Sequence, residues 1–388
     1  MNIRIWSIFI LIFYCAGTTI TLAQTVAEKR CEVAQNRRED GKLIIAGQTG
    51  PVSMKLERGG RVSIRNQIGS IKITGWERDD VEAQATGEDG LEPIQVEMIS
   101  GQAQPCLMLS CPARGQRGAE IDLEVKLPRY AQIESVTIAR GDIEIKGIEG
   151  AIKASSSRGD IYVDGAGSIE ARGSNGRVSI NGVNGSASAH LNNGDLVAKN
   201  VKGNLSAKLL NGDANIENVQ GLVNISTTSG SINVFKAGGN VQVVSLSDSI
   251  SVKDVKGRVE ANSASGSIEL SDVGEDIDAA TVSGDVTFTG AIRANGRYRL
   301  KSVSGEVLMV ISPDSPGFTA HLSSYSGDIE TDFTLTLESP VQINRRVTGR
   351  FGDGQAQITL DSFSGTVKLS KARTGTTKER KKDKDHKK

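Results

Sequence analysis

Aromatic residues and histidine are scarce in this sequence. Aromatic residues make up 4% of the 388 residues, and the three histidines, His190, His321 and His386, lie far apart. Sugar binding by stacking needs exposed aromatic rings, and acid–base catalysis commonly uses histidine. His190 is expected to be a surface residue. The sequence therefore gives little support for a stacking carbohydrate site, and no catalytic residue, metal site or cofactor is predicted.

The chain also lacks an excess of charge and a long apolar segment. Lys plus Arg and Asp plus Glu both number 46, so the formal net charge is zero. Nucleic-acid-binding domains usually carry a basic excess, and no nucleic-acid partner is predicted. After the first 23 residues no apolar run approaches the roughly 18 residues of a membrane-spanning helix. No transmembrane segment is expected in the mature chain, and no helical periodicity of useful length appears.

Residues 1–23 have the layout of a secretory signal peptide. A single early Arg4 precedes an apolar run from Ile5 to Ala16, and a small-residue end follows at Leu22-Ala23. The run is too short to span a bilayer. The mature protein is therefore predicted to be exported, to the periplasm, the cell surface or the medium.

Three cysteines remain after the predicted cleavage: Cys31, Cys106 and Cys111. Exported proteins normally pair their cysteines. Cys106 and Cys111 are nearest in sequence, but Leu107 to Leu109 has the pattern of a strand that would hold their sulfurs apart. Cys31 paired with either of the others is at least as plausible, so a disulfide is predicted without a choice of partners.

Glycine, in contrast, recurs at a nearly constant spacing of 17 or 18 residues, with one gap of 36 in which Asp248 takes the glycine position: Gly141, Gly159, Gly176, Gly194, Gly212, Gly230, Gly266 and Gly284. An apolar pair such as Ile143/Ile145 follows each, which is the alternation of a half-buried strand. A second glycine series, including Gly203 and Gly221, halves the period to about nine residues. This repeat predicts an all-β, single-stranded parallel β-solenoid with rungs of about 18 residues, two strands per rung and β caps at both ends.

Stacked rungs should place equivalent residues above one another as ladders. The position before the corner glycine is first Asn and then Ser, and stacked amides and hydroxyls can hydrogen-bond along the column. A column of small residues is expected to face inward opposite Ile and Val. The amide and hydroxyl ladder comprises Asn175, Asn193, Asn211, Ser229, Ser265, Ser283, Ser304 and Ser326, and the small column Ala154, Ala171, Ala189, Ala207, Ala261 and Ala279.

Changes in repeat length and composition divide the chain. Residues 24–132 are expected to form an N-terminal β region and cap, and residues 133–370 the β-solenoid with a C-terminal cap rich in aromatic residues. Residues 371–388 hold nine basic and three acidic residues and should be a disordered basic tail. The tail could attach to anionic polymers or lipid head groups through Arg380, Lys381, Lys382, Lys384, Lys387 and Lys388.

Acidic residues recur after the corner glycines, as at Asp142/Asp160 and Asp195/Asp213. The period resembles that of calcium-binding β-rolls, but their double-glycine corner is missing, so the acids are interpreted as turn-capping groups. Arg-Gly-Asp occurs at 140–142 and 158–160, where Gly-Asp belongs to the repeat itself. The alternative to a binding protein is a carbohydrate-active solenoid enzyme that uses corner acids.

The chain resembles a bacterial putative-adhesin domain of unknown function. The resemblance is carried by the stretch from Gly69 to Ala83 with its Gly-Trp-Glu-Arg-Asp core, by Ile121 to Pro128, and by the serial Ser-Gly-Asp/Ser units through Gly365. It covers roughly residues 45–370 and implies a bacterial envelope or secreted β-solenoid without established catalytic residues. The predicted function is an exported non-enzymatic adhesin-like or envelope scaffold that binds an unknown surface ligand, either polysaccharide or protein.

Overall fold

The computed structural model describes residues 42–99, 106–111, 119–312, 314–337 and 346–372. Regular structure in these residues consists of β-strands, which confirms the all-β class. The predicted signal peptide, Cys31 and the tail residues Arg380 to Lys388 lie outside the described residues.

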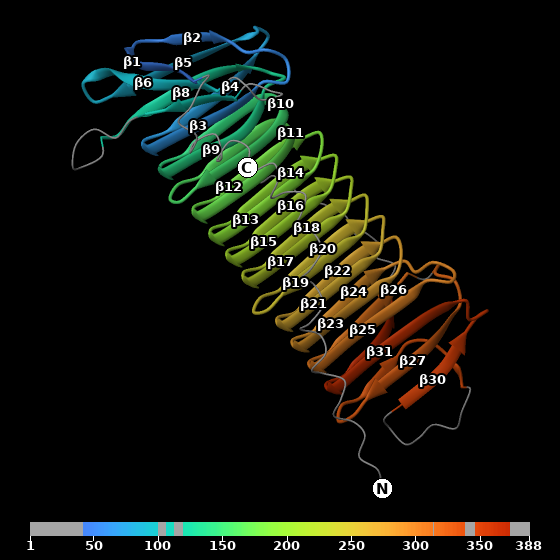
Figure 1. Cartoon of the computed structure of the whole chain (residues 1–388). Helices are drawn as coiled ribbons and strands as arrows, with labels where there is room; N and C mark the ends of the chain where they lie inside the picture. The colour runs from blue at the N-terminus through green and yellow to red at the C-terminus, as the bar shows by residue number, and fades with distance from the viewer. Residues whose placement is uncertain (1–41, 100–105, 112–118, 313, 338–345, 373–388) are drawn as a thin grey trace, which may run out of the picture.

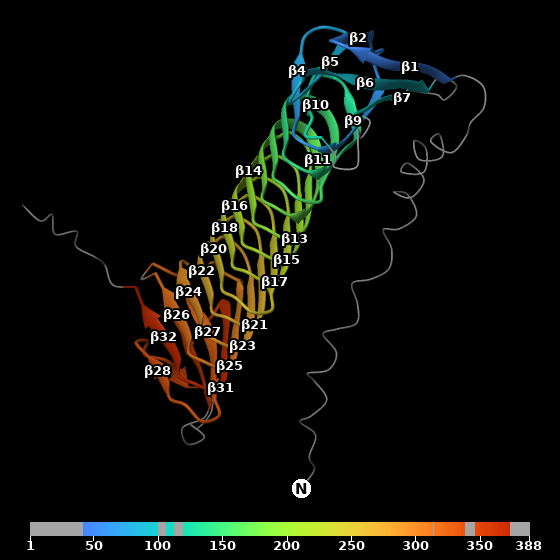
Figure 2. The ribbon, with the colours of Figure 1, turned by 90° about the vertical axis from the view of Figure 1, so that its left-hand side faces the viewer.

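Two ladders of parallel strands lie face to face and form a β-solenoid-like stack (Figures 1 and 2). The chain passes from a strand of the second ladder through a corner glycine to a strand of the first ladder, and we call this pair a rung. The first ladder runs, in spatial order, through β8 (Asp122–Pro128), β4 (Ile71–Trp76), the first half of β10 (Ile143–Ser156), the first half of β11 (Ile161–Asn175), β12 (Val178–Val183), β14 (Leu196–Val201), β16 (Ala214–Val219), β18 (Ile232–Ala237), β20 (Ile250–Val255), β22 (Ile268–Val273), β24 (Val286–Gly290), β26 (Val307–Ile311), β32 (Val367–Lys371) and β28 (Ile329–Thr331). The second ladder runs through β7 (Cys106–Ser110), β3 (Arg61–Ile68), β9 (Gln132–Arg140), the second halves of β10 and β11, β13 (Ala187–Asn193), β15 (Leu205–Asn211), β17 (Val223–Ser229), β19 (Val241–Ser245), β21 (Val259–Ser265), β23 (Ile277–Ser283), β25 (Arg297–Ser304), β31 (Ala356–Ser364) and β27 (Phe318–Ser324).

The register of the ladders follows the sequence period. Leu196 pairs with Ala214, and Leu205 pairs with Val223, in each case a partner 18 residues away. Alternate side chains from both ladders point inward and fill the space between them. The predicted small column is buried there: Ala154, Ala171, Ala189, Ala207, Ala261 and Ala279. The core is therefore a continuous apolar layer along the whole stack.

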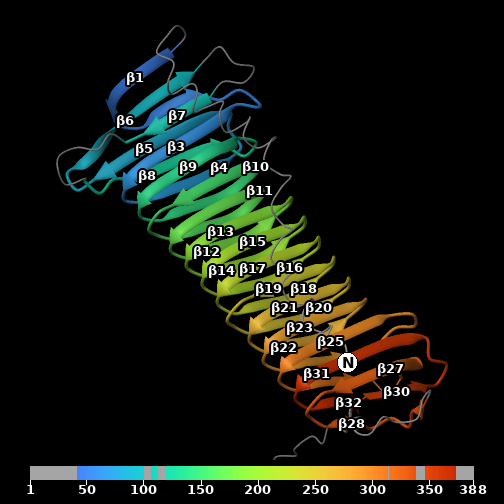
Figure 3. The same cartoon turned by 60° about the horizontal axis from the view of Figure 1, so that its bottom comes forward.

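The spatial order of the rungs departs from the chain order at both ends. The rung β31/β32 lies between β25/β26 and β27/β28, although it comes last in the sequence (Figures 1 and 3). At the other end the earlier rung β3/β4 lies between β7/β8 and β9/β10. Parallel stacking thus begins well before residue 133, where the sequence placed the start of the solenoid.

Antiparallel strands close both ends of the stack. At the N-terminal end these are β1 (Lys42–Thr49), β2 (Val52–Lys55), β5 (Asp80–Gly87) and β6 (Gly90–Ile99), and at the C-terminal end β29 (Thr336–Leu337) and β30 (Arg346–Phe351). An antiparallel edge cannot continue the parallel register, so these strands limit growth of the stack.

The corner glycines make the close approach between rungs possible. Gly212 has a φ of 131°, and a Cβ added there would lie 2.1 Å from the carbonyl oxygen of Gly194 in the rung before. Asp248 stacks in register with the corner glycines, but unlike them it does not have a positive φ. Its Oδ2 accepts a hydrogen bond of 2.9 Å from the Gly230 N–H. Asp248 therefore occupies the glycine position with a different local geometry.

A second column of left-handed residues, which the sequence analysis does not predict, lies at the opposite corner. It begins with glycines and continues with other residues: Gly147, Gly165, Gly182, Asn200, Asn218, Lys236, Asp254 and Asp272, with φ between 54° and 78°. Glycine and asparagine tolerate this conformation best. Their spacing of 17 or 18 residues in the sequence is the signal that could have revealed the column.

The C-terminal cap has its own aromatic core. Phe318, Phe333 and Phe351 pack together with ring centroids 5.1–5.3 Å apart. The last strand also extends beyond the predicted end of the solenoid at residue 370, since β32 includes Lys371 and the Ala372 N–H donates to the Ile311 carbonyl at 2.8 Å. Lys371 Nζ lies 5.0 Å from the Phe333 ring centroid. The predicted tail boundary thus cuts through the last strand.

Candidate functional site

The two described cysteines lie in or beside β7. Cys106 Sγ lies 4.0 Å from Ser63 Oγ on the neighbouring β3. Cys111 is buried, and this burial, with a smaller contribution from Glu92, raises the pKa of its thiol to about 11. A disulfide to Cys31 stays a prediction because Cys31 is outside the described residues.

The corner acids bind backbone amides of the next rung. Asp142 Oδ1 accepts from the Asp160 N–H at 2.8 Å, and Asp195 Oδ1 accepts from the Asp213 N–H at 3.1 Å. Both Arg-Gly-Asp segments lie at such corners. Among the described residues no group of three or more His, Cys, Asp or Glu side chains could hold a metal ion. The observed contacts of these acids join the corner of one rung to the corner of the next, so the acids stabilise the stacking of rungs.

The predicted amide ladder is present. Asn193 Nδ2 donates to Asn175 Oδ1 at 3.2 Å, and Asn211 Nδ2 donates to Asn193 Oδ1 at 2.8 Å. From β17 onward a different hydroxyl column appears two residues earlier, inside the corner: Thr227, Ser245, Ser263, Thr281, Ser302, Ser362 and Ser324 are buried. Most of these hydroxyls bond a backbone carbonyl, such as Ser302 Oγ to Gly284 O at 2.8 Å.

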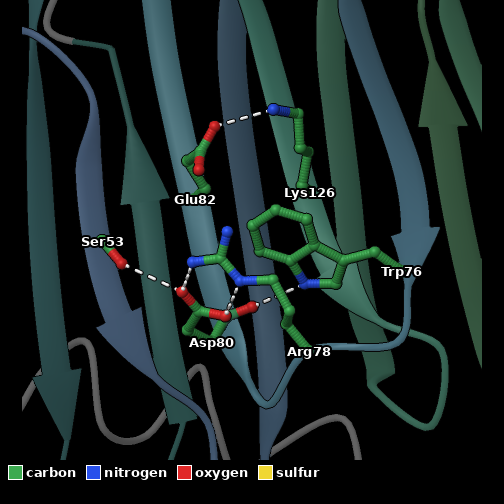
Figure 4. A network of polar contacts seen from close by, with 6 residues as sticks. All are labelled: Ser53, Trp76, Arg78, Asp80, Glu82 and Lys126. Carbon is green, nitrogen blue, oxygen red and sulfur yellow. Dashed lines mark hydrogen bonds and ion pairs between the residues drawn. The ribbon is translucent and has the colours of Figure 1, made fainter.

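The Gly-Trp-Glu-Arg-Asp segment forms a network that fastens the N-terminal cap (Figure 4). The Trp76 indole N–H donates to the Asp80 carbonyl at 2.8 Å, and Arg78 Nε and Nη2 donate to the Asp80 carboxylate at 2.9 and 2.5 Å. These bonds from Arg78 are the main reason that the pKa of Asp80 lies below its ordinary value. The network therefore fixes the turn between β4 and β5.

Cations also lie against the Trp76 ring in this network. The Arg78 guanidinium carbon is 4.3 Å from the ring centroid, and Lys126 Nζ is 5.5 Å away while it bonds Glu82 Oε1 at 2.7 Å. Such cation–π contacts stabilise the turn and occupy ring surface that a sugar would need. We interpret the segment as structural.

A row of residues follows the glycine corner over eight rungs, two residues before each corner position; six of them are exposed, and Thr228 and Val303 are half-buried. We call it the corner ridge. In spatial order it comprises Leu210, Thr228, Leu246, Ala264, Val282, Val303, Phe363 and Tyr325. Leu210 is 50% exposed and Val282 is 46% exposed. Steps of about 4.8 Å give the ridge a length of roughly 34 Å.

The corner ridge ends in a stacked aromatic pair. Tyr325 and Phe363 are both 56% exposed, and their ring centroids are 4.7 Å apart with an interplanar angle of 5°. They are 38 residues apart in sequence and meet because β31 lies beside β27. The sequence predicts these aromatics only as cap residues, because the members of the ridge become neighbours only once the order of the last rungs is known.

The strip beside the corner ridge carries no charge. The residue after each ridge position is Asn211, Ser229, Ser247, Ser265, Ser283, Ser304, Ser364 or Ser326. Charged residues form 24% of the whole chain, so a strip of sixteen uncharged corner residues is a distinct surface. Depletion of charge together with exposed apolar side chains is typical of the centre of a protein interface.

In the part of the chain that the structure describes, no helix has the length and apolarity needed to cross a membrane. A comparison with curated proteins found no match.

Several solved structures align with this chain at low similarity. A putative cell adhesion protein from Clostridium sporogenes ATCC 15579 is 9% identical with a TM-score of 0.17, over 84% of this chain and 100% of that one. A putative adhesin from Bacteroides fragilis NCTC 9343 is 10% identical with a TM-score of 0.22, over 83% and 97%. A putative adhesin from Parabacteroides distasonis ATCC 8503 is 11% identical with a TM-score of 0.24, over 68% and 97%.

A family model described as Toastrack DUF4097 matches residues 223–370. This range contains the buried hydroxyl column, the corner ridge from Thr228 onward and the C-terminal cap. The match over residues 223–370 confirms the resemblance to a bacterial putative-adhesin domain of unknown function.

Proposed function

We propose that this protein is an exported, non-enzymatic, adhesin-like scaffold whose corner ridge contacts a protein at the bacterial cell surface. The observation that carries the proposal is the uninterrupted, uncharged and partly apolar ridge along a solvent-exposed corner. Soluble proteins seldom expose a contiguous apolar surface without a binding role.

The fold suits the corner ridge to binding. The hydrogen-bonded ladders hold the ridge residues at a fixed spacing, so little conformational entropy is lost when a partner binds. The aliphatic members and the mutually stacked Tyr325 and Phe363 present ring edges and methyl groups. These groups complement apolar protein side chains better than the polar faces of a sugar.

The test compares surface binding of a ridge variant with that of a charge-matched control. Leu246→Lys with Val282→Lys places two cations on the ridge, and Gln242→Lys with Ser251→Lys places two on the outer faces of the ladders. Labelled protein is titrated onto intact bacterial cells, untreated or pretreated with protease or with periodate. We expect the ridge variant to bind at least about tenfold more weakly than both the control and the original chain.

Protease pretreatment should abolish binding and periodate should not. Equal binding by the ridge variant and the control would refute a role for the ridge, and loss of binding after periodate alone would replace the protein partner with a glycan. Circular dichroism of the two variants should be the same, since Leu246, Val282 and Gln242 are exposed and Ser251 is partly exposed on an outer face.

The enzymatic alternative is tested separately. Incubation with envelope and plant polysaccharides should give no sustained cleavage. Cleavage that is lost in Asp195→Asn or Asp213→Asn would overturn the non-enzymatic assignment.

A further inference from the structure

Three basic side chains are stacked in one column on the outer face of the second ladder. Arg172 on β11 pairs in register with His190 on β13, and His190 pairs with Lys208 on β15. All three are exposed. Adjacent rungs are about 4.8 Å apart, so the column spreads three basic groups over roughly 10 Å.

The repeat does not require basic residues in this column. The equivalent positions on the neighbouring rungs are Ser155 before Arg172, and Ser226 after Lys208. Arg172 and Lys208 carry like charges two rungs apart, and protonated His190 would place a like charge directly opposite both of them, which is destabilising. Serine in this column would avoid that repulsion.

Acidic side chains neutralise only part of the positive charge of this column. Glu170 Oε1 lies 2.6 Å from Arg172 Nη2, whereas among the described residues Lys208 makes no ion pair. Neighbouring atoms cover part of the exposed His190 ring, and this partial desolvation lowers its pKa; the charges of Arg172 and Lys208 lower the pKa further, while Glu170 opposes them. These three charged groups are the ones that face His190 from the strands on both sides.

The surroundings of the column are polar and suit an oxygen-rich ligand. Ser188 and Ser206 occupy the outward positions two residues before His190 and Lys208, and Asn224 continues the same row. Hydroxyl and amide groups can donate to and accept from sugar hydroxyls. The second halves of β11, β13 and β15 contain no Phe, Tyr or Trp, the large rings on which nucleobases stack best.

We propose that the column of Arg172, His190 and Lys208 binds an acidic polysaccharide, whose carboxylate or sulfate groups contact the three basic side chains and whose hydroxyls contact Ser188 and Ser206. This site is separate from the corner ridge and goes beyond the proposed function. Anion binding removes the mutual repulsion within the column. Protonation of His190 adds a third positive charge, so affinity increases as the pH falls.

The experiment measures dissociation constants for dextran sulfate and polygalacturonate, with neutral dextran as the uncharged probe, at about 0.05 M salt where screening is modest. Lys208→Ser introduces the residue that the next rung already has. Lys301→Ser is the matched control, because Lys301 lies in the same column farther along the stack but bonds Asp361 at 3.4 Å. Both variants keep the basic C-terminal residues, so any binding by that segment is common to both.

We expect Lys208→Ser to weaken binding of the acidic probes about tenfold, as for loss of one charge-assisted contact, and Lys301→Ser to leave it nearly unchanged. His190→Gln should remove the increase in affinity between pH 7 and pH 5. Equal weakening by both lysine variants, no preference for acidic over neutral dextran, or tighter binding of DNA or of anionic phosphatidylglycerol vesicles than of the acidic glycans would overturn the proposal. The ridge variant should bind the acidic probes as well as the original chain does, so the proposals for the corner ridge and for the basic column are tested separately.

Discussion

At the residue scale, the stack depends on glycine at the corners because the backbones of successive rungs nearly touch there. In Gly212→Ala the new Cβ would meet the Gly194 carbonyl oxygen at 2.1 Å, at a φ of 131°. We expect destabilisation of about 3 kcal/mol or more in urea unfolding. Gly173→Ala is the control, since its Cβ would have only ordinary contacts from 3.5 Å outward. Equal stability of the two variants would show that the corners can open.

A substitution in the left-handed column should increase the stability of the protein, in contrast to the glycine substitution. Lys236 has a φ of 63°, and the equivalent Asn218 donates from Nδ2 to Asn200 Oδ1 at 2.8 Å. Lys236→Asn should relieve backbone strain and add one amide to this second run of amides, which joins Asn200 and Asn218 at the opposite corner. We expect a gain of about 0.5–1 kcal/mol in the free energy of unfolding. Lys253→Asn, on the outer face of the next rung, should give no gain, and a similar gain there would argue against the strain explanation.

Individual residues show which features the sequence could predict. The corner glycines and the amide ladder from Asn175 to Asn211 could be predicted because a strict period places equivalent residues above one another. The left-handed column was harder, since glycine, Asn, Lys and Asp share a backbone conformation there rather than a residue type. The corner ridge mixes Leu, Thr, Ala, Val and aromatic residues, so its pattern is a shared exposure rather than a sequence motif.

At the element scale, the order of the terminal rungs could not be predicted from the sequence. Every rung offers the same hydrogen-bonding register to its neighbours, so alternation and glycine spacing identify strands without stating which strands pair. The positions of β3/β4 and β31/β32 depend on the antiparallel strands that cover the outermost rungs. This exchange of order brings Phe363 beside Tyr325 and completes the corner ridge.

Truncation of the chain before β31/β32 should destabilise the C-terminal end of the stack. Removal of residues 354–388 leaves β25/β26 and β27/β28 without the rung that joins them. The exposed parallel edge should then template association between molecules. We expect a lower melting temperature and aggregates in light scattering. A chain ending at Ala372 should remain monodisperse, and equally good behaviour of the shorter chain would show that β27/β28 can pair directly with β25/β26.

At the scale of the whole molecule, the stack separates three surfaces that can act independently. The basic column lies on an outer face near the N-terminal half, and the corner ridge follows one corner toward the C-terminal cap. The chain after Ala372 begins at the far end of β32. A rigid stack with several spaced contacts can gain affinity through multivalency without any one strong site. Such spacing fits an adhesin-like scaffold on an extended envelope.

The basic segment after Ala372 is expected to add attachment without adding stability. It holds no apolar residue that could pack on the core, and most of its charges are positive. A chain ending at Ala372 should therefore melt at the same temperature as the full mature chain while it binds anionic vesicles less. The difference in binding should fade as salt reaches a few tenths molar, where the screening length falls below about 8 Å. Equal vesicle binding at low salt would exclude the segment from attachment, and a lower melting temperature of the shorter chain would show that the segment packs against the last rungs.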